Sequence, residues 1–340
     1  MRRRLVAVRA REAIPLPRAK FLSAQANYAA YAADACGYAF RSLDGDDGYL
    51  FEVRDGARRA VFAGGAGSPY ALNDVRAASI ARDKAFCAEV LQGAGLPVLP
   101  GRMFFVTKRW ADMRGPGREP EDALAYAAST EYPLFCKPIS GSNGIFAEMI
   151  EDVSAFADYV IRVSREHFAI LVQPYVRAAE HRVFMLEGRA LFSYRKHLPS
   201  VVGDGVRSLR ALVGALPQGE ETPALLAHDG AGRRVAPDNI VAAGARVMLE
   251  GPANRSAGGG SQALRDGAAE PLAKLALSAA AAVGLRLAAV DIFDTSQAGD
   301  LSALSIIEVN SNPMIATLED HGRWDLIEVI WRANFAAALR

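Results

Sequence analysis

Residues 306 to 313 read Ile-Ile-Glu-Val-Asn-Ser-Asn-Pro, and residues 288 to 294 read Ala-Ala-Val-Asp-Ile-Phe-Asp. Both stretches are short runs of apolar and β-branched residues that end in turn-forming residues, a pattern typical of buried strands. Each nevertheless carries an acid in its interior, Asp291 in one and Glu308 in the other. Taken singly, Asp291 could be a strand-end residue and Glu308 a buried acid with a partner, so each position by itself leaves both a structural and a functional interpretation open.

The two acids and Asn310 form a candidate metal site. Asn310 lies two residues beyond Glu308, so strand alternation places both side chains on one face. If the two strands pair in antiparallel fashion, Asp291 joins them, and two carboxylates and an amide oxygen converge. Such an all-oxygen site suits a hard cation such as Mg²⁺, which usually keeps several water ligands and is also coordinated by substrate phosphates.

The composition is that of an ordinary globular protein. The chain has 340 residues, of which 51% are hydrophobic and 23% charged, and a length of this kind predicts two or three domains. A formal net charge of +1 gives no overall field that would recruit nucleic acid or an anionic membrane. The three cysteines, Cys36, Cys87 and Cys136, are far apart, which argues against a zinc site or a disulfide framework and favours the cytoplasm.

A second candidate site lies in residues 132 to 146, where a strand carrying Lys137 is followed by a loop of small residues, Ser140 to Gly144. Backbone N–H groups in such a loop can surround phosphate oxygens, and a lysine supplies the compensating charge. A lone strand lysine more often faces solvent, so this stretch by itself leaves both interpretations open.

Three further features frame these sites. Residues 49 to 62 predict a hairpin that turns at Asp55-Gly56, and residues 180 to 196 predict another that turns at Glu187-Gly188. On the first strand of the latter, Glu180 and Arg182 share one face. Residues 217 to 245, rich in proline, glycine and charge, are interpreted as an excursion from the core.

Along the chain, a lysine and a loop suited to phosphate come first, followed by a linker, a hairpin that carries an arginine, and finally the two acidic strands. In this order of features the chain resembles the ATP-grasp superfamily of carboxylate–amine ligases. Asp291 with Glu308-Val-Asn310 and Pro313 carries the resemblance most clearly, and Lys137-Pro and Gln173-Pro-Tyr-Val support it. The stretches Val202-Gly-Asp-Gly and Arg246-Val-Met-Leu look like the ATP-grasp part of cyanophycin synthetase and of bifunctional glutathione synthetase.

The resemblance implies an α+β (α/β) fold of the ATP-grasp type, in which two α+β subdomains clamp ATP. We expect a small α/β N-terminal domain over residues 1–80, a small ATP-grasp subdomain with the phosphate loop over 81–165, and a large subdomain with the magnesium site over 166–340. Dimerisation is suggested only by the family pattern.

The resemblance also implies roles for individual residues. Three residues would hold one or two Mg²⁺ ions, or Mn²⁺ in their place: Asp291, Glu308 and Asn310. ATP would be bound by Lys84, Lys137, Ser140, Gly141, Ser142, Gly144, Gln173, Tyr175, Val176 and Glu180, with the adenine at the backbone of residues 173–176 and the ribose at Glu180. The catalytic residues would be the three cations Arg182, Arg195 and Arg255 together with Asn254, which precedes Arg255 in the sequence.

Two positions depart from the family pattern. D-alanine–D-alanine ligases place an arginine two residues before the first metal aspartate, where this chain has Ala289. The missing charge would have to come from Arg182, Arg195 or Arg255. Many relatives also follow the final proline with glycine, whereas this chain has Met314.

The implied reaction transfers the γ-phosphoryl group of ATP to a carboxylate, and the amine of an amino acid or peptide then displaces phosphate. The absence of a GxSxG or HExxH motif agrees with a site that works by positioning and electrostatics. Two alternatives remain at this point: an ATP-grasp kinase acting on a non-carboxylate substrate, and a non-catalytic nucleotide-binding regulatory module.

Overall fold

The computed structural model describes residues 20–65, 67–141, 144–216, 226–251, 253, 259–261 and 264–340. The chain divides into two compact units, one comprising the described residues up to Ala71 together with Leu318–Arg340, and the other Leu72–Thr317. Helices and sheets are mixed in both units, which confirms the predicted α+β class. Within the described residues, no helix has the length and apolar character needed to cross a membrane. The expected boundaries near residues 80 and 165 remain predictions.

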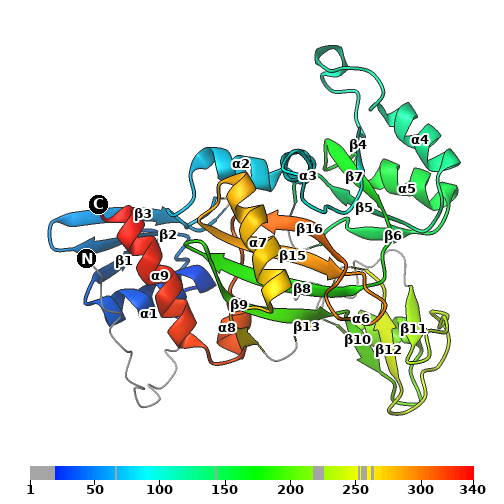
Figure 1. Ribbon diagram of the computed structural model, residues 1–340. Helices are drawn as coiled ribbons and strands as arrows, with labels where there is room; N and C mark the ends of the chain where they lie inside the picture. Colours follow the sequence, from blue (N-terminus) through cyan, green and yellow to red (C-terminus); the bar gives the residue numbers. More distant parts are fainter. Residues whose placement is uncertain are drawn as a thin grey trace. The chain divides into compact units, whose positions relative to one another are not determined.

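The first unit is an antiparallel sheet with helices packed against it (Figure 1). Its strands follow the order β1-β2-β3, with β1 at Ala39–Ser42, β2 at Leu50–Asp55 and β3 at Arg58–Ala63. The predicted hairpin of residues 49 to 62 is therefore confirmed, but Asp55 pairs with Arg58, so its turn residues are Gly56 and Ala57 instead of Asp55 and Gly56. Its helices are α1 (Ala24–Cys36) and α9 (Trp324–Ala338), which pack together, and the short α8 (Ala316–Asp320) precedes α9. Trp331 of α9 is fully buried against Phe51 and Phe62.

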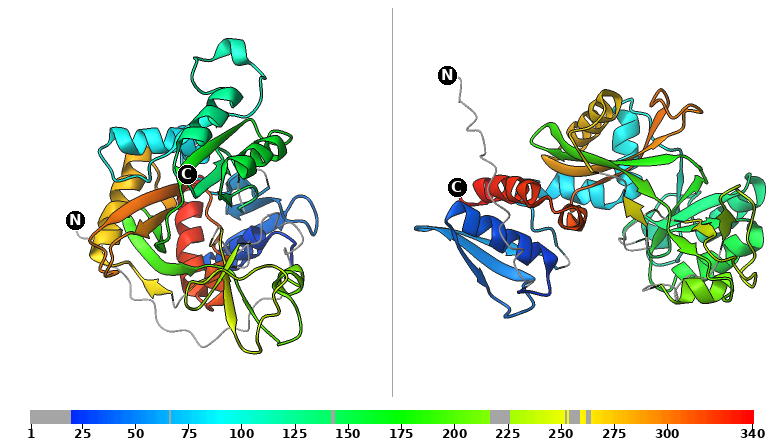
Figure 2. Two further views of the ribbon diagram at one scale, coloured as in Figure 1. Left: turned by 90° about the vertical axis from the view of Figure 1, so that its right-hand side faces the viewer. Right: turned by 90° about the horizontal axis from the view of Figure 1, so that it is seen from below.

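The second unit is built on a sheet of order β13-β9-β8-β15-β16, with β14 also pairing with β9. The strands are β8 (Ala179–Leu186), β9 (Arg189–His197), β13 (Gly260–Ser261), β14 (Arg265–Asp266), β15 (Leu287–Asp294) and β16 (Leu304–Asn310). Three helices, α2 (Val75–Arg82), α3 (Lys84–Gly93) and α7 (Glu270–Val283), cover one face (Figures 1 and 2). The apolar residues of that face, among them Val183, Val290, Ile292 and Val309, pack beneath the helices.

The predicted strands around Asp291 and Glu308 are confirmed as β15 and β16, and they pair in antiparallel fashion. The second predicted hairpin is confirmed as β8 and β9. Its turn residues Glu187 and Gly188 have φ values of 50° and 76°, the left-handed conformation that a tight hairpin turn requires and that glycine adopts freely.

A four-stranded sheet of order β4-β7-β5-β6 carries the candidate phosphate loop. Its elements are β4 (Arg102–Phe105), the 3₁₀ turn Ala111–Met113, α4 (Pro120–Ser129), β5 (Leu134–Pro138), β6 (Glu148–Ile150), α5 (Val153–Val163) and β7 (Ala169–Pro174). Leu134, Cys136 and Val172 face a core that α4 and α5 complete. Strand alternation therefore leaves Phe135, Lys137 and Gln173 on the opposite face.

Part of the predicted excursion, residues 227–229, is a strand of a small sheet whose other elements flank residues 217–245. Strands β10 (Ser200–Val202), β11 (Ala227–Asp229) and β12 (Arg246–Leu249) form a small sheet of order β10-β12-β11, and helix α6 (Leu209–Gly214) packs against β10. Leu209, Leu212, Val241 and Val247 build a separate core there. Residues 217–245 contribute Ala227, Val235 and Val241 to this core, and these few apolar residues are spread thinly along a polar stretch.

Candidate active site

The face of the main sheet that the three helices leave free carries a row of charged side chains. Asp291 on β15 lies directly opposite Glu308 on one neighbouring strand and Arg182 on the other. Side chains in such positions have Cβ atoms about 4.5–5.5 Å apart. The structure thus brings together the two acids that the sequence placed on separate strands.

A β-bulge explains how β16 serves both the core and this charged face. The register moves from Asp291↔Glu308 to Ile292↔Ile306, so Ile307 is the extra residue. Without the bulge, Ile306 and Glu308 would share a face, because side chains alternate with a period of two. With it, Ile306 and Val309 enter the apolar core, while Glu308 keeps its place opposite Asp291.

Asp291 is almost completely buried and is held by two cations. Arg182 donates two hydrogen bonds of 2.7 Å, one to each carboxylate oxygen, and Lys196 Nζ lies 2.9 Å from Oδ2. Burial alone would raise the pKa of Asp291, but the attraction of Arg182 and Lys196 outweighs it and holds the pKa well below its ordinary value. Asp291 is therefore a carboxylate at neutral pH.

Lys196 is the residue of this face that the sequence reasoning missed. Its buried ammonium group also donates to Glu180. Counting back from the turn at Glu187-Gly188 would place Arg195 opposite Glu180, but a second bulge shifts the register from Met185↔Ala190 to Phe184↔Phe192. Arg195 consequently lies opposite His181, is exposed, and points to the other face. Of the arginines considered for the charge missing at Ala289, Arg182 therefore lies on the face of Asp291, whereas Arg195 does not.

Glu308 and Asn310 are neighbours on the charged face, as predicted. The amide nitrogen of Asn310 donates to Glu308 Oε1 over 3.1 Å, which leaves the amide oxygen of Asn310 available. Burial would raise the pKa of Glu308, but attraction by Lys84 and Lys137 outweighs it and keeps the pKa below its ordinary value. The two candidate phosphate lysines are thus electrostatic neighbours of the acidic strands.

The two lysines come from different elements. Lys84 is the first residue of α3, after the N-cap Asp83, and its Nζ donates to the carbonyl of Gly141 over 3.0 Å. Lys137 is buried on β5, and burial lowers its pKa. Ser140 and Gly141 are exposed, so the near end of the predicted loop is open to a ligand.

The predicted nucleotide hinge follows β7. Gln173 is buried, its Nε2 donates to the carbonyl of Leu99, and its Oε1 has no hydrogen-bond partner within the described residues. Tyr175 N donates to the carbonyl of Pro133, while Val176 is half-buried. A buried acceptor without a partner is uncommon, and a bound ligand can supply the missing donor.

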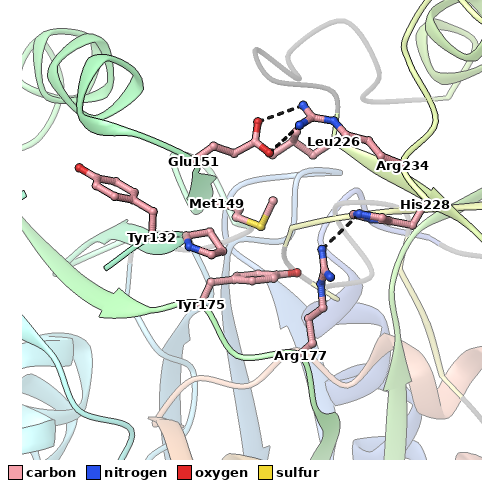
Figure 3. A pocket seen from close by; sticks show the side chains of 9 residues that line it. Tyr132, Met149, Glu151, Tyr175, Arg177, Leu226, His228 and Arg234 are labelled. Atoms are coloured by element: carbon pink, nitrogen blue, oxygen red, sulfur yellow. Dashed lines mark hydrogen bonds and ion pairs between the residues drawn. The ribbon is translucent and has the colours of Figure 1, made fainter. Parts of the chain in front are cut away.

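A pocket of about 510 Å³ opens beside this hinge (Figure 3). Aromatic and apolar side chains line much of it, and charged groups complete it: Tyr132, Pro133, Met149, Glu151, Tyr175, Arg177, Leu226, His228 and Arg234. Met149 lies opposite Phe135, so the pocket and Lys137 belong to the same face of the sheet. Residues 226–250 contribute its remaining wall.

Glu250 fastens this wall to the hinge. Its buried carboxylate accepts a hydrogen bond from the Tyr175 hydroxyl and lies 3.1 Å from Arg177 and 2.8 Å from His228 Nδ1. A second pair, Glu151 and Arg234, joins the same two elements at 2.9 and 3.0 Å but is largely exposed (Figure 3).

We expect Glu250→Ala to lower the free energy of unfolding by about 1–3 kcal/mol, because it leaves the half-buried Tyr175 hydroxyl without its acceptor. Glu151→Ala is the matched control and should change it by only about 0–1 kcal/mol, since exposed ion pairs contribute little. Urea unfolding of both variants measures the difference. Equal losses in the two variants would contradict the assignment of Glu250 as the stronger fastening.

The described residues allow a test of whether a metal fits. Within them, no three histidine, cysteine, aspartate or glutamate side chains gather as a metal site. Asp291 and Glu308 would therefore need the amide oxygen of Asn310 as a third protein ligand, and this all-oxygen set suits Mg²⁺ with phosphate and water completing the shell. Three predicted site residues, Ser142, Asn254 and Arg255, lie outside the described residues.

Comparisons with known proteins add relatives to this geometry. No family model matches the chain. It is 28% identical over 219 residues to the glutathione biosynthesis bifunctional protein GshAB of Mannheimia succiniciproducens, which covers 55% of this chain and 28% of the relative. It is 32% identical over 119 residues to a D-alanine–D-alanine ligase of Bifidobacterium animalis, covering 34% of this chain and 31% of the relative.

Among solved structures, a bifunctional glutathione synthetase from Pasteurella multocida aligns with a TM-score of 0.46 at 22% identity, over 86% of this chain and 40% of that one. The chain thus spans about a third of the length of the two curated relatives. The sequence relatives confirm that this chain is similar to the ATP-grasp carboxylate–amine ligases.

Proposed function

We propose that this protein is an ATP-dependent ligase that joins a carboxylate to the amine of an amino acid or peptide and releases ADP and phosphate. The observation that carries the proposal is the charged face, where Asp291 and Glu308 lie opposite each other and Lys84 and Lys137 attract Glu308. Acids and lysines in this arrangement can hold a polyphosphate together with its divalent cation.

The lysines are the proposed phosphate contacts. Lys137 is buried on the face of β5 that looks away from the core formed with α4 and α5, and Lys84 holds the first part of the Ser140 to Gly144 loop through Gly141. A lysine presents a point charge with several donors, which suits the mobile oxygens of a phosphate chain. Ser142 belongs to the same proposed loop.

The hinge and its pocket are the proposed base site. Pro133 borders the pocket and Lys137 lies four residues further along the strand, about 13 Å at the rise of a β-strand. An extended nucleoside triphosphate can bridge this length. The unpartnered Gln173 Oε1 supplies an acceptor, the backbone around Tyr175 and Val176 supplies further polar groups, and Glu180 is the proposed ribose contact.

Asp291, Glu308 and Asn310 are the proposed ligands of one or two Mg²⁺ ions. When bound, the metal would neutralise phosphate charge and orient the transferred group. The residues of this chain do the remaining work: the two lysines hold the phosphates, Arg182 fixes Asp291, and the pocket positions the nucleotide.

The reaction follows from the chemistry of the carboxylate, whose oxygen is a poor leaving group. Transfer of the γ-phosphoryl group to that oxygen gives an acyl phosphate and ADP. The amine nitrogen then attacks the acyl carbon, the C–O bond to phosphate breaks, and the amine loses a proton as the amide forms. Loop closure would protect the acyl phosphate from water. Arg182, Asn254 and Arg255 are the proposed catalytic residues on the side of the site where the substrates bind.

Incubation of the protein with ATP, Mg²⁺, pooled carboxylic acids and pooled amino acids tests the function. Release of ADP and phosphate that depends on the amine supports ligation. Phosphoryl transfer to a hydroxyl would instead identify a kinase, and tight nucleotide binding without turnover would identify a regulatory module. The charged face favours turnover because it retains acids and lysines together.

We expect Lys137→Met to weaken ATP binding and lower kcat/KM by about 10²–10³-fold, because it removes a preorganised buried cation. Lys274, an exposed residue of α7, provides the control substitution Lys274→Met, which should leave turnover unchanged. Isothermal titration with ATP and steady-state kinetics give both quantities. Wild-type kinetics in Lys137→Met would remove Lys137 from the site.

The proposal extends to the setting of the protein. The three cysteines are free thiols, which supports a cytoplasmic location. The proposed partners are small-molecule substrates, and we propose binding to neither nucleic acid nor a membrane. The family pattern suggests a homodimer, and size-exclusion chromatography with light scattering measures the state directly.

A further inference from the structure

Lys196 is the member of the charged face that the proposed reaction has not yet used. Only 7% of the residue is exposed, and its ammonium group lies 2.9 Å from Asp291 Oδ2 and bonds to Glu180. A buried lysine is costly unless it is paired, so these contacts keep it charged. Burial and Arg182 would lower its pKa, but Asp291 and Glu180 outweigh them and raise it.

Asp291 does not need Lys196 for charge balance. Arg182 alone bonds both of its oxygens at 2.7 Å and supplies one positive charge for one negative charge. Lys196 belongs to β9, and β8 lies between that strand and β15, so the lysine reaches across a whole strand to become a second cation on the same carboxylate. It is therefore a second positive charge at a carboxylate to which a divalent cation would have to bind.

The two cations differ in how readily they can leave. The guanidinium of Arg182 is a rigid fork that fits the carboxylate with two parallel bonds. The ammonium of Lys196 is a point charge on a flexible stem, makes a single bond to Asp291, and keeps Glu180 as a second partner. Lys196 can therefore give up Asp291 at less cost than Arg182 can.

We propose that Lys196 competes with a divalent cation for Asp291 and, once released, contacts the phosphate oxygens of the nucleotide. The inference rests on the proposed function and names the residue that supplies the positive charge missing at Ala289. The same side chain thus pairs with Asp291 in the metal-free protein and neutralises phosphate charge in the loaded protein.

Binding measurements test this without turnover. Mn²⁺ is titrated by electron paramagnetic resonance into wild type and Lys196→Met, first alone and then with an ATP analogue that has a non-hydrolysable β–γ bridge. We expect Lys196→Met to bind Mn²⁺ alone about tenfold more tightly, because a positive charge beside the site is gone. The same variant should bind the Mn²⁺–analogue complex about tenfold more weakly, because a phosphate contact is gone.

The opposite signs separate this role from a structural one, since a damaged site would weaken both affinities. Lys196→Arg keeps the charge and should stay near wild type in the metal titration, and Lys274→Met should match wild type in both. Lys196→Gln is measured in parallel because its amide can still donate to the acids, and it too must tighten Mn²⁺ alone. Unchanged or weaker Mn²⁺ binding in folded Lys196→Met and Lys196→Gln overturns the competition. Unchanged analogue binding overturns the phosphate contact.

These outcomes are independent of ligation. If the wild-type protein forms no amide but both affinities shift as expected, the proposed function fails and the role of Lys196 stands. If amide forms and the affinities do not shift, the reverse holds.

Discussion

Asp291→Asn is expected to lower the free energy of unfolding by about 3–5 kcal/mol, because it leaves two cations beside an uncharged buried group. Arg182 makes both of its 2.7 Å bonds to this carboxylate, and Lys196 is itself buried. An asparagine can accept one of these bonds, but its amide nitrogen would face the other donors. Guanidinium unfolding followed by circular dichroism measures the loss.

The double variant Asp291→Asn with Lys196→Met separates charge from packing. Removal of one surplus cation should restore part of the lost stability, so the two substitutions should not add. If Asp291→Asn alone unfolds at the wild-type denaturant concentration, the carboxylate does not hold the two cations as described.

Glu308→Gln is expected to lower kcat by about 10²–10³-fold while changing the free energy of unfolding by only about 1 kcal/mol. Glu308 has no ion-pair partner within 4.0 Å among the described residues, and its bond from Asn310 can persist to a glutamine oxygen. The lost charge therefore affects the proposed metal and phosphates more than the fold. Amine-dependent ADP release and urea unfolding measure the two effects.

Glu319, an acid outside the sheet, provides the control variant Glu319→Gln, which should retain full turnover. Glu319 accepts a hydrogen bond of 2.6 Å from Tyr28 in the first unit. Full activity in Glu308→Gln would contradict the assignment of Glu308 to the metal. A large loss of stability with normal turnover would assign it to the fold instead.

The comparison of Asp291 with Glu308 shows how two similar sequence signals separate in three dimensions. Each is an acid within an apolar strand, and the sequence predicts the same role for both. In the structure, one is held by a rigid arginine and a lysine, whereas the other is influenced by two lysines of a different sheet and helix. Their stability effects are therefore predicted to differ, although their proposed functions are shared.

Several features could be predicted from local sequence. The strands around Asp291 and Glu308 follow from β-branched runs, and the turns at Gly56 and Gly188 follow from a glycine that adopts positive φ freely. The shared face of Glu308 and Asn310 follows from a two-residue spacing. In each case the physical cause lies within a few residues of the chain.

Register could not be predicted in this way, and it decided the composition of the charged face. The bulge at Ile307 directs Ile306 into the core while keeping Glu308 opposite Asp291. The bulge in β9 places Lys196, and not Arg195, on the charged face opposite Glu180. A bulge depends on how both faces of a sheet are satisfied, so one strand's pattern does not reveal it. The sequence by itself determined the acidic strands, their turns and the resemblance to ATP-grasp ligases, because these depend on local spacing and residue type. Only the tertiary structure decided which cations reach Asp291 and which residues wall the hinge pocket, because those contacts join strands and loops distant in the chain.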